Sequence, residues 1–367
     1  MANGKNAIAA VDEPATHRVP EPASAHTSLL SGTVTRLPLT PNPVRISDEP
    51  IVAAGSAPGY GPIFNAGLIA HEGVFHLFAR GVRDGYRRND GPGARFLDYI
   101  SDVLVFTSTD GREYAFQQVL AKGSPEGVHC YEDPRVQRVH TGAGGEEKFV
   151  MSYTDLPAPD SGKPWRIGVQ RLGFADGRFH LNRTSGRVVG PDGVPNKDAV
   201  LFNLRDGRVA MIHRVHPNVQ VAVFDSLDDL WSPPAGYWDT HMAELDRHTI
   251  LTPSAGALGV GAGPPPLLVG DDLLFFFHER EASGQYTAKV ALLDQDTGHV
   301  VAQLAEPIMR PELPWERVGD VNDVVFVQGA VARPDGTIYL AYGAADRCVG
   351  AAVVQAAAVV HALRAAA

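Results

Sequence analysis

The chain has 367 residues, a hydrophobic content of 44% and a formal net charge of −10 at pH 7. This composition is that of an ordinary globular protein, and the negative charge argues against a nucleic-acid phosphate backbone as a partner. Two cysteines, Cys130 and Cys348, are too few for a disulfide framework, so we expect buried free thiols and leave a single bridge open. The absence of a long apolar run and of a secretory signal predicts a cytoplasmic protein with no membrane partner.

The first 45 residues are rich in Pro, Ala, Ser and Thr and show no strong periodicity. We therefore expect residues 1–45 to form an N-terminal extension that is flexible or partly docked. Residues 46–367 are expected to form a single domain.

A pattern of strands then recurs five times, with a period of roughly 60 to 75 residues, which marks a repeat architecture. Each unit opens on polar or Gly/Pro residues and continues into an apolar strand, a turn and a second apolar strand. The openings are residues 65–67, 131–135, 196–198, 263–266 and 322–329, and the second strands are residues 74–80, 148–153, 208–214, 273–278 and 337–342.

A third apolar stretch follows each second strand, at residues 100–106, 166–172, 219–224, 286–293 and 349–354. Short strands at regular spacing indicate antiparallel sheets, and radial repetition of small sheets is typical of a β-propeller. We predict an all-β fold, a five-bladed β-propeller with an extended N-terminal arm. Residues 45–52 are expected to add an outer strand to the last blade and close the ring. The five openings then converge at one end of the channel, where residues 83–96 form a long loop over the mouth.

Asp133, in the segment Tyr131-Glu132-Asp133-Pro134-Arg135, is the leading catalytic candidate. A channel carboxylate with Arg135 two residues on, and therefore on the same side of a strand, is suited to donate a proton to a leaving group. Asp-Pro is also a common turn opener, so a purely structural role stays open.

A group of cations is expected in the third unit. Lys197 follows Asn196 at the opening, and His213 and Arg214 end the second strand. Three such side chains in one concave site resemble a seat for phosphate or carboxylate. The alternative is an ion pair between Lys197 and Asp198 that only satisfies the channel wall.

Four more polar residues lie at strand ends or openings, and each also has a structural alternative as a turn cap, a wall histidine or a packing residue. These are Asn65, His278, Tyr342 and Asp346. Phosphate-loop, dinucleotide, zinc-helix and calcium-loop motifs are missing from the sequence, so we expect no metal and no cofactor.

Four segments together resemble glycoside hydrolase family 130, the β-mannoside phosphorylases. They are residues 131–135 (Tyr-Glu-Asp-Pro-Arg), 196–202 (Asn-Lys-Asp-Ala-Val-Leu-Phe), 261–266 (Gly-Ala-Gly-Pro-Pro-Pro) and 342–346 (Tyr-Gly-Ala-Ala-Asp). The resemblance runs from about residue 65 to residue 350, with the segments in the family's order and spacing. It implies a five-bladed β-propeller, which agrees with the repeat count.

The resemblance also implies inverting phosphorolysis, in which inorganic phosphate, the co-substrate, attacks the anomeric carbon of a terminal β-mannosyl unit and yields α-mannose 1-phosphate. Asp133 would be the general acid, acting through the mannose 3-hydroxyl. One carboxylate suffices because phosphate is itself a nucleophile. The implied phosphate ligands are Lys197 and His213, with Arg135, Arg80 or Arg214, and the implied sugar contacts are Asn65, Asp198, His278, Tyr342 and Asp346.

We therefore expect a glycosyltransferase-type phosphorylase that prefers β-1,2-linked manno-oligosaccharides over β-1,4-mannosyl-glucose or mannosyl-N-acetylglucosamine. Departures from the family's pattern surround the anion seat, where Val215-His216-Pro217 follows Arg214 and Glu279 follows His278. They leave open a β-mannosidase on the same fold, or a non-catalytic carbohydrate-binding propeller. A homo-oligomer is also left open.

Overall fold

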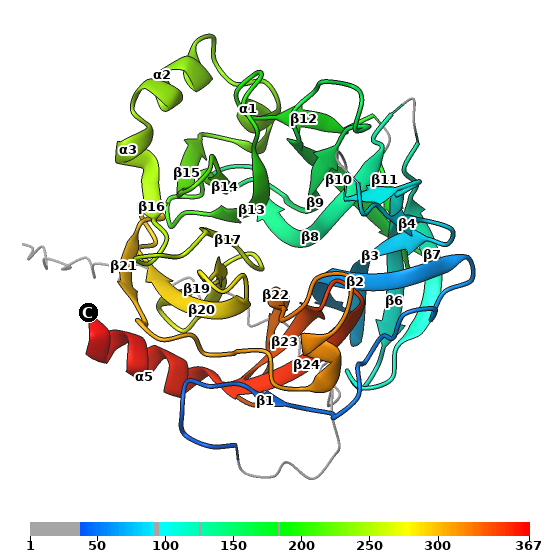
Figure 1. Ribbon diagram of the computed structural model, residues 1–367. Helices are drawn as coiled ribbons and strands as arrows, with labels where there is room; N and C mark the ends of the chain where they lie inside the picture. Colours follow the sequence, from blue (N-terminus) through cyan, green and yellow to red (C-terminus); the bar gives the residue numbers. More distant parts are fainter. Residues whose placement is uncertain (1–36, 92–94, 125–126, 183) are drawn as a thin grey trace, which may run out of the picture.

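The computed structural model describes residues 37–91, 95–124, 127–182 and 184–367, and these form a five-bladed β-propeller (Figure 1). The expected extension over residues 1–45 therefore falls largely outside the described residues. The second and third strands predicted for each unit are confirmed, and they pair antiparallel in every blade.

The first two blades begin with long strands. Blade 1 contains β2 (Tyr60–His71), β3 (Val74–Arg83), β6 (Ser101–Ser108) and β7 (Ala115–Ala121). Blade 2 contains β8 (Cys130–His140), β9 (Glu147–Leu156), β10 (Arg166–Ala175), β11 (Arg178–Leu181) and β12 (Arg187–Val189). The long loop expected over the mouth contains a small hairpin, β4 (Arg87–Arg88) and β5 (Phe96–Leu97).

The other three blades follow the same order from the channel outward. Blade 3 contains β13 (Lys197–Asn203), β14 (Val209–Arg214), β15 (Val219–Phe224) and β16 (Thr249–Leu251). Blade 4 contains β17 (Gly259–Ala262), β18 (Leu267–Val269), β19 (Asp272–Arg280), β20 (Tyr286–Leu293) and β21 (Val300–Gln303). Blade 5 contains β22 (Val325–Ala332), β23 (Thr337–Ala344), β24 (Cys348–Gln355) and β1 (Val44–Arg45).

The ring is closed by β1, as predicted from the sequence. Val44 pairs with Val353 of β24, so the outermost strand of blade 5 comes from the opposite end of the chain. Arg45 then reaches inward, and its Nε lies 2.7 Å from a carboxylate oxygen of the buried Glu316. A buried, hydrogen-bonded ion pair fixes this strand in one register, since breaking such a pair leaves an uncompensated charge.

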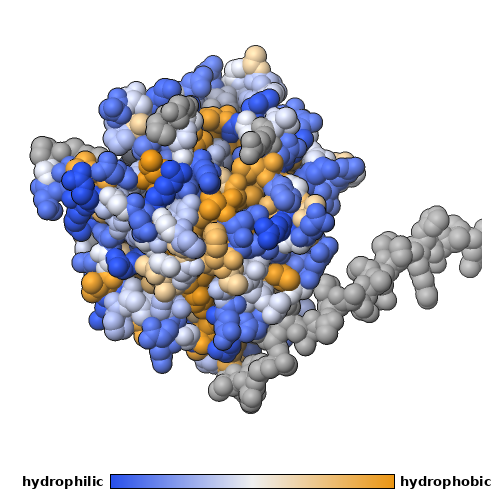
Figure 2. All heavy atoms as spheres, turned by 90° about the vertical axis from the view of Figure 1, so that its right-hand side faces the viewer, coloured by the Kyte–Doolittle hydropathy of each residue, from blue (hydrophilic) through white to orange (hydrophobic). Residues whose placement is uncertain are grey.

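The hydrophobic core is divided among the blade interfaces. Each of the five clusters of apolar side chains within the described residues lies between two neighbouring sheets, as between Phe78 of blade 1 and Met151 of blade 2. Both faces of each blade are thus buried, which explains why the strands read as nearly continuous apolar runs. The outer side of blades 1 and 2 is mostly hydrophilic, with hydrophobic residues in a narrow band (Figure 2).

Two features differ from the sequence-based expectation. Residues 263–266, expected to open a strand, instead separate β17 from β18, because consecutive prolines cannot donate to a strand ladder. The described residues also contain five short helices that were not predicted: α1 (Leu227–Trp231), α2 (Tyr237–Ala243), α3 (Leu245–His248), α4 (Pro314–Arg317) and α5 (Ala356–Ala366). The last packs Val359 and Leu363 onto the interface of blades 4 and 5.

Cys130 and Cys348 are both buried free thiols, as expected. Within the part of the chain that the structure describes, no helix has the length and apolar character needed to cross a membrane.

Candidate active site

The innermost strands of blades 1, 2 and 3 bulge at the same end of the channel. Their registers shift at Asn65, Asp133 and Asp198, and these residues have φ angles of 46°, 49° and 56°. A bulge redirects a side chain, and a non-glycine residue at positive φ persists only where the surroundings hold it. Three polar side chains are thereby turned toward the axis at one level.

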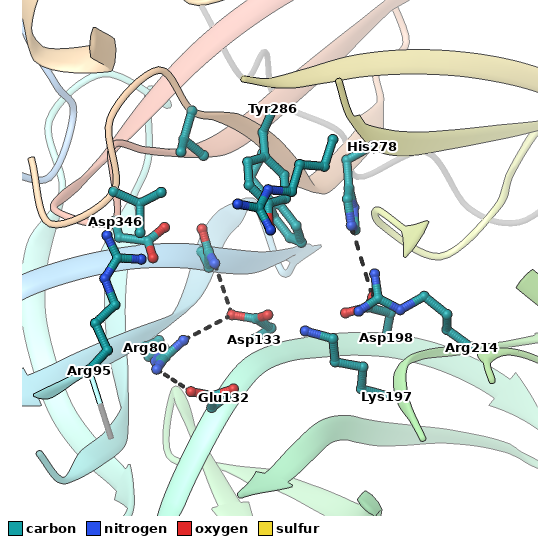
Figure 3. A pocket seen from close by; sticks show the side chains of 15 residues that line it. Arg80, Arg95, Glu132, Asp133, Lys197, Asp198, Arg214, His278, Tyr286 and Asp346 are labelled. Carbon is teal, nitrogen blue, oxygen red and sulfur yellow. Dashed lines mark hydrogen bonds and ion pairs between the residues drawn. The ribbon is translucent and has the colours of Figure 1, made fainter. Parts of the chain in front are cut away.

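These side chains line a pocket of about 210 Å³ to which all five blades contribute (Figure 3). The pocket brings together eight of the residues predicted from the sequence: Asn65, Arg80, Asp133, Lys197, Asp198, Arg214, His278 and Asp346. It also contains residues that were not predicted: Arg95, Glu132, Arg280, Tyr286, Val321, Val324 and Phe326.

Asp133 is held from two sides near the centre of the pocket. Asn65 Nδ2 donates a hydrogen bond of 2.9 Å to Asp133 Oδ1, and Arg80 Nη1 lies 3.6 Å from the same oxygen. Arg80 also contacts Glu132 and donates to the Tyr99 hydroxyl at 2.7 Å. Burial alone would lower the pKa of Arg80, but Glu132, Tyr99 and Asp133 outweigh it and keep the guanidinium charged. The carboxyl group of Asp133 is therefore fixed in orientation at the pocket surface.

Asp198 is surrounded by positive charge. Arg214 Nη1 lies 3.2 Å from Asp198 Oδ2 and Arg135 Nη2 lies 3.5 Å from Oδ1. Burial would raise the pKa of Asp198, but Arg214, Lys197 and the other cations hold it well below its usual value. Burial lowers the pKa of His278, 3.9 Å away, to about 3, so this ring is neutral. A side chain on Gly261 would put its Cβ 2.5 Å from Asp198 Oδ2, so the contact requires glycine there.

Lys197 and Arg280 are cations without a carboxylate partner within 4.0 Å among the described residues. The Lys197 ammonium faces the Trp165 ring, 6.0 Å from its centroid, and the Arg280 guanidinium lies over the Tyr286 ring at 5.6 Å. Each is free to pair with an incoming anion.

The pocket as a whole favours an anion, although the protein is acidic. The described residues that line it include five cations, Arg80, Arg95, Lys197, Arg214 and Arg280, and four carboxylates, Glu132, Asp133, Asp198 and Asp346. Burial raises the pKa of Asp346 to about 7, which further reduces the negative charge. A phosphate-sized anion is therefore favoured here.

Three predicted residues do not reach the pocket. Arg135 is fully buried and donates to the carbonyl oxygens of Ala262 and Gly263, at 2.7 and 2.8 Å. The buried Tyr342 donates to Glu316 at 2.8 Å. His213 Nε2 lies 3.0 Å from His241 Nε2, and burial lowers the His213 pKa well below its usual value.

The local geometry explains these placements. Successive side chains of a strand point to opposite faces, so Arg214 of β14 enters the pocket while His213 points away. The bulge at Asp133 shifts the register by the time the strand reaches Arg135, so the same-side spacing of these two residues does not hold. Among the residues missed, Glu132 stood beside Asp133 in the same segment, and Arg95 lay in the loop expected over the mouth.

The comparisons with known proteins agree with this geometry. The family model described as "Glyco_hydro_130: beta-1,4-mannooligosaccharide phosphorylase" matches residues 34–365. The chain belongs to glycoside hydrolase family 130. The family resemblance and the five-bladed fold expected from the sequence are thus confirmed.

Relatives of this family 130 protein include a 1,2-beta-oligomannan phosphorylase of Thermoanaerobacter sp. (strain X514), 29% identical over 318 residues that cover 85% of this chain and 96% of the relative. The fold is similar to that of the beta-1,2-mannobiose phosphorylase from Listeria innocua in complex with beta-1,2-mannobiose, with a TM-score of 0.66, 16% identity and coverage of 88% and 99%. A further solved structure is described with family 130 glycoside hydrolases that target beta-1,2 mannosidic linkages in Candida mannan; it has a TM-score of 0.62, 20% identity and coverage of 85% and 93%.

Proposed function

We propose that this protein catalyses the inverting phosphorolysis of terminal β-mannosides and releases α-mannose 1-phosphate. The observation that carries the proposal is the meeting of Asp133 and Lys197 in one pocket, on the innermost strands β8 and β13 of neighbouring blades (Figure 3). A fixed carboxyl group and an unpaired ammonium group are the two functions that the reaction needs. The first supplies a proton, and the second holds the nucleophile.

In the proposed reaction, a phosphate oxygen attacks the anomeric carbon as the bond to the glycosidic oxygen breaks. The leaving oxygen takes a proton from the mannose 3-hydroxyl, which takes one in turn from Asp133, and Asp133 is later protonated again from solvent. Phosphate needs no base to activate it, so a second catalytic carboxylate is not required. The configuration at the anomeric carbon inverts because attack and departure occur on opposite faces of the sugar.

The proposed anion seat consists of Lys197, Arg214 and Arg280. Arg214 is already paired with Asp198, but its guanidinium has further N–H groups. His213 is not included, because its ring is buried against His241. Asn65, Asp198, His278 and Asp346 are the proposed contacts for the mannosyl hydroxyls, since all four line the same pocket.

The proposed substrates are β-1,2-linked manno-oligosaccharides. The support is the 1,2-beta-oligomannan phosphorylase from Thermoanaerobacter, which this chain matches over most of both lengths. The reaction transfers a glycosyl group to phosphate, so the enzyme would be a glycoside phosphorylase that also runs in the synthetic direction.

The test is incubation of the protein with β-1,2-mannobiose, with and without inorganic phosphate. We expect α-mannose 1-phosphate and mannose in equal amounts, with the anomer assigned by NMR, and no turnover without phosphate. Mannose release at the same rate in the absence of phosphate would reject the phosphorylase.

A β-mannosidase is the second candidate, and the placement of His213 favours it. The sequence resemblance implied His213 as a phosphate ligand, yet this ring lies outside the pocket. In a mannosidase, water would take the place of phosphate. The same assay separates the two, because only the mannosidase releases two mannose molecules per disaccharide without phosphate.

A further inference from the structure

Two segments from opposite ends of the propeller sequence are tied together over the pocket. The Tyr86 hydroxyl donates to the Asp320 carboxylate, and Arg95 Nη2 donates to the Asp320 carbonyl oxygen at 2.8 Å. Tyr86 directly precedes β4 and Arg95 directly precedes β5 in the hairpin of blade 1, whereas Asp320 lies between α4 and β22, where the chain enters blade 5. We call these three residues the blade 1–5 bridge.

The bridge is part of a packed wall. Tyr86 contacts Phe96 and Tyr99 edge-on, with ring centroids 5.6 Å apart in each case, and Phe96 stacks on Tyr99 at 5.3 Å. Tyr99 in turn accepts the hydrogen bond from Arg80. The position of Arg95 is therefore connected through aromatic packing to the same arginine that holds Asp133.

The pocket has two sides, with Asp133 between them. Arg95 and Asp346 lie on the side of blades 1 and 5, and Lys197, Asp198 and Arg214 lie on the side of blade 3 (Figure 3). The charges that act on the two carboxyl groups agree with this division. Arg80 and Arg95 lower the pKa of Asp346, whereas Arg214 and Lys197 lower that of Asp198. On the bridge side, Val321 and Val324 provide apolar surface.

An in-line displacement places the nucleophile and the leaving group on opposite faces of the reacting sugar. This inference rests on the proposed function: with phosphate on the side of Lys197 and Arg214, the leaving sugar must depart on the side of the blade 1–5 bridge. We propose that Arg95 and Val321 form the subsite for the leaving-group sugar, a neutral, hydroxyl-rich residue. Arg95 donates to one of its hydroxyls, and Val321 packs against its apolar ring face.

The test uses Arg95→Leu in the synthetic direction, with α-mannose 1-phosphate as donor and mannose as acceptor. We expect the KM for mannose to rise at least about tenfold, the loss of one charge-assisted hydrogen bond. The KM for α-mannose 1-phosphate should stay within about twofold of the wild-type value. Arg88→Leu is the matched control, because Arg88 is an exposed arginine of the same hairpin outside the pocket, and it should change neither constant.

Tyr86→Phe is a second, milder variant. It removes the hydroxyl contact with Asp320 but leaves the Arg95 bond, so we expect a smaller rise in the KM for mannose than Arg95→Leu produces. An equal melting temperature for wild type and variants shows that the fold is retained. If the melting temperature of Arg95→Leu is lower than that of wild type, the test relies on Tyr86→Phe alone. An unchanged KM of Tyr86→Phe for mannose then overturns the proposal.

Two results with folded Arg95→Leu would overturn the subsite. One is an unchanged KM for mannose, and the other is a rise confined to the KM for α-mannose 1-phosphate, which would assign Arg95 to the anion. Failure of the proposed function is separate, because it appears in the wild-type enzyme as turnover without phosphate. In that case water attacks from the same side, and the KM of Arg95→Leu for β-1,2-mannobiose still tests the subsite: a rise supports it and no change rejects it.

Discussion

The innermost strands of blades 2 and 4 occupy equivalent places in the ring but contribute in different ways. In blade 2, β8 bulges and turns Asp133 into the pocket. In blade 4, β17 ends at Ala262 before three prolines, and among the described residues it places no side chain in the pocket. Instead, the carbonyl oxygens of its last residue, Ala262, and of the next residue, Gly263, accept hydrogen bonds from Arg135 of blade 2. Strand β8 therefore supplies both the proposed catalytic acid and an anchor, Arg135, which is held by the carbonyl oxygens at the end of β17.

The first test of this comparison replaces Asp133, the proposed catalytic acid of blade 2. We expect Asp133→Asn to lower kcat about a thousandfold, within the usual range for loss of a general acid. Binding of β-1,2-mannobiose, measured by calorimetry, should persist, because asparagine keeps the size of the side chain. Asp271→Asn, at an exposed position in blade 4, is the control. A kcat of Asp133→Asn within about tenfold of the wild-type value would show that Asp133 is not the general acid.

The second test replaces Arg135, the anchor of blade 2. Arg135→Met fills a similar volume but leaves the carbonyl oxygens of Asp133, Ala262 and Gly263 without their guanidinium donor, while Asp198 keeps its ion pair with Arg214. We expect the free energy of unfolding to fall by about 3 to 5 kcal/mol, because each buried carbonyl oxygen left without a donor costs about 1 to 3 kcal/mol. Urea denaturation measures it. Arg138→Met, on the exposed part of the same strand, should cost less than about 1 kcal/mol, and equal losses in the two variants would contradict the anchoring role.

The third test concerns blade 3, where Lys197 precedes the bulge at Asp198. Lys197→Met should raise the KM for phosphate about 10- to 100-fold, because a hydrogen bond to a charged group is lost. The KM for the disaccharide should change less. Lys163→Met, an exposed lysine in the loop before β10, should behave as wild type. A variant whose phosphate KM equals that of wild type would remove Lys197 from the anion seat.

The smallest expected effect extends the comparison to blade 5. Burial raises the pKa of Asp346 to about 7 from an ordinary value of 3.8, so its protonated form is favoured in the folded state. The stability that this group contributes is complete below about pH 4 and is lost as the pH rises through 7. Asn resembles the protonated form, so the melting temperature of Asp346→Asn minus that of wild type should increase from pH 4 to pH 8. A difference that does not vary with pH would contradict the raised pKa.

The repeat and the strands were predictable because the apolar runs and turn signals are local features. The meeting of Asn65, Asp133, Lys197 and Asp198 was also predictable, since equivalent positions in a propeller share one end of the axis. Which side chains point into the channel could not be predicted from the sequence. A one-residue bulge reverses which side chains enter the channel, and this separates Arg135 from the pocket although it lies two residues beyond Asp133.

The long-range contributions were the other part that the sequence could not reveal. Arg95 is held at the pocket by a hydrogen bond to the carbonyl oxygen of Asp320, from the other end of the propeller sequence. Helix α2 places His241 against His213 on the side of β14 that faces away from the pocket. Such contacts depend on how loops fold over the blades, and no spacing along the chain encodes them.

The closing strand has a consequence for synthesis on the ribosome. Residues 44–45 emerge before any blade, but their partner β24 is the last strand to be translated. Strand β1 therefore stays unpaired with β24 while four complete blades and most of the fifth leave the exit tunnel. A nascent chain stalled before residue 348 would lack the partner of β1 and could not close the ring.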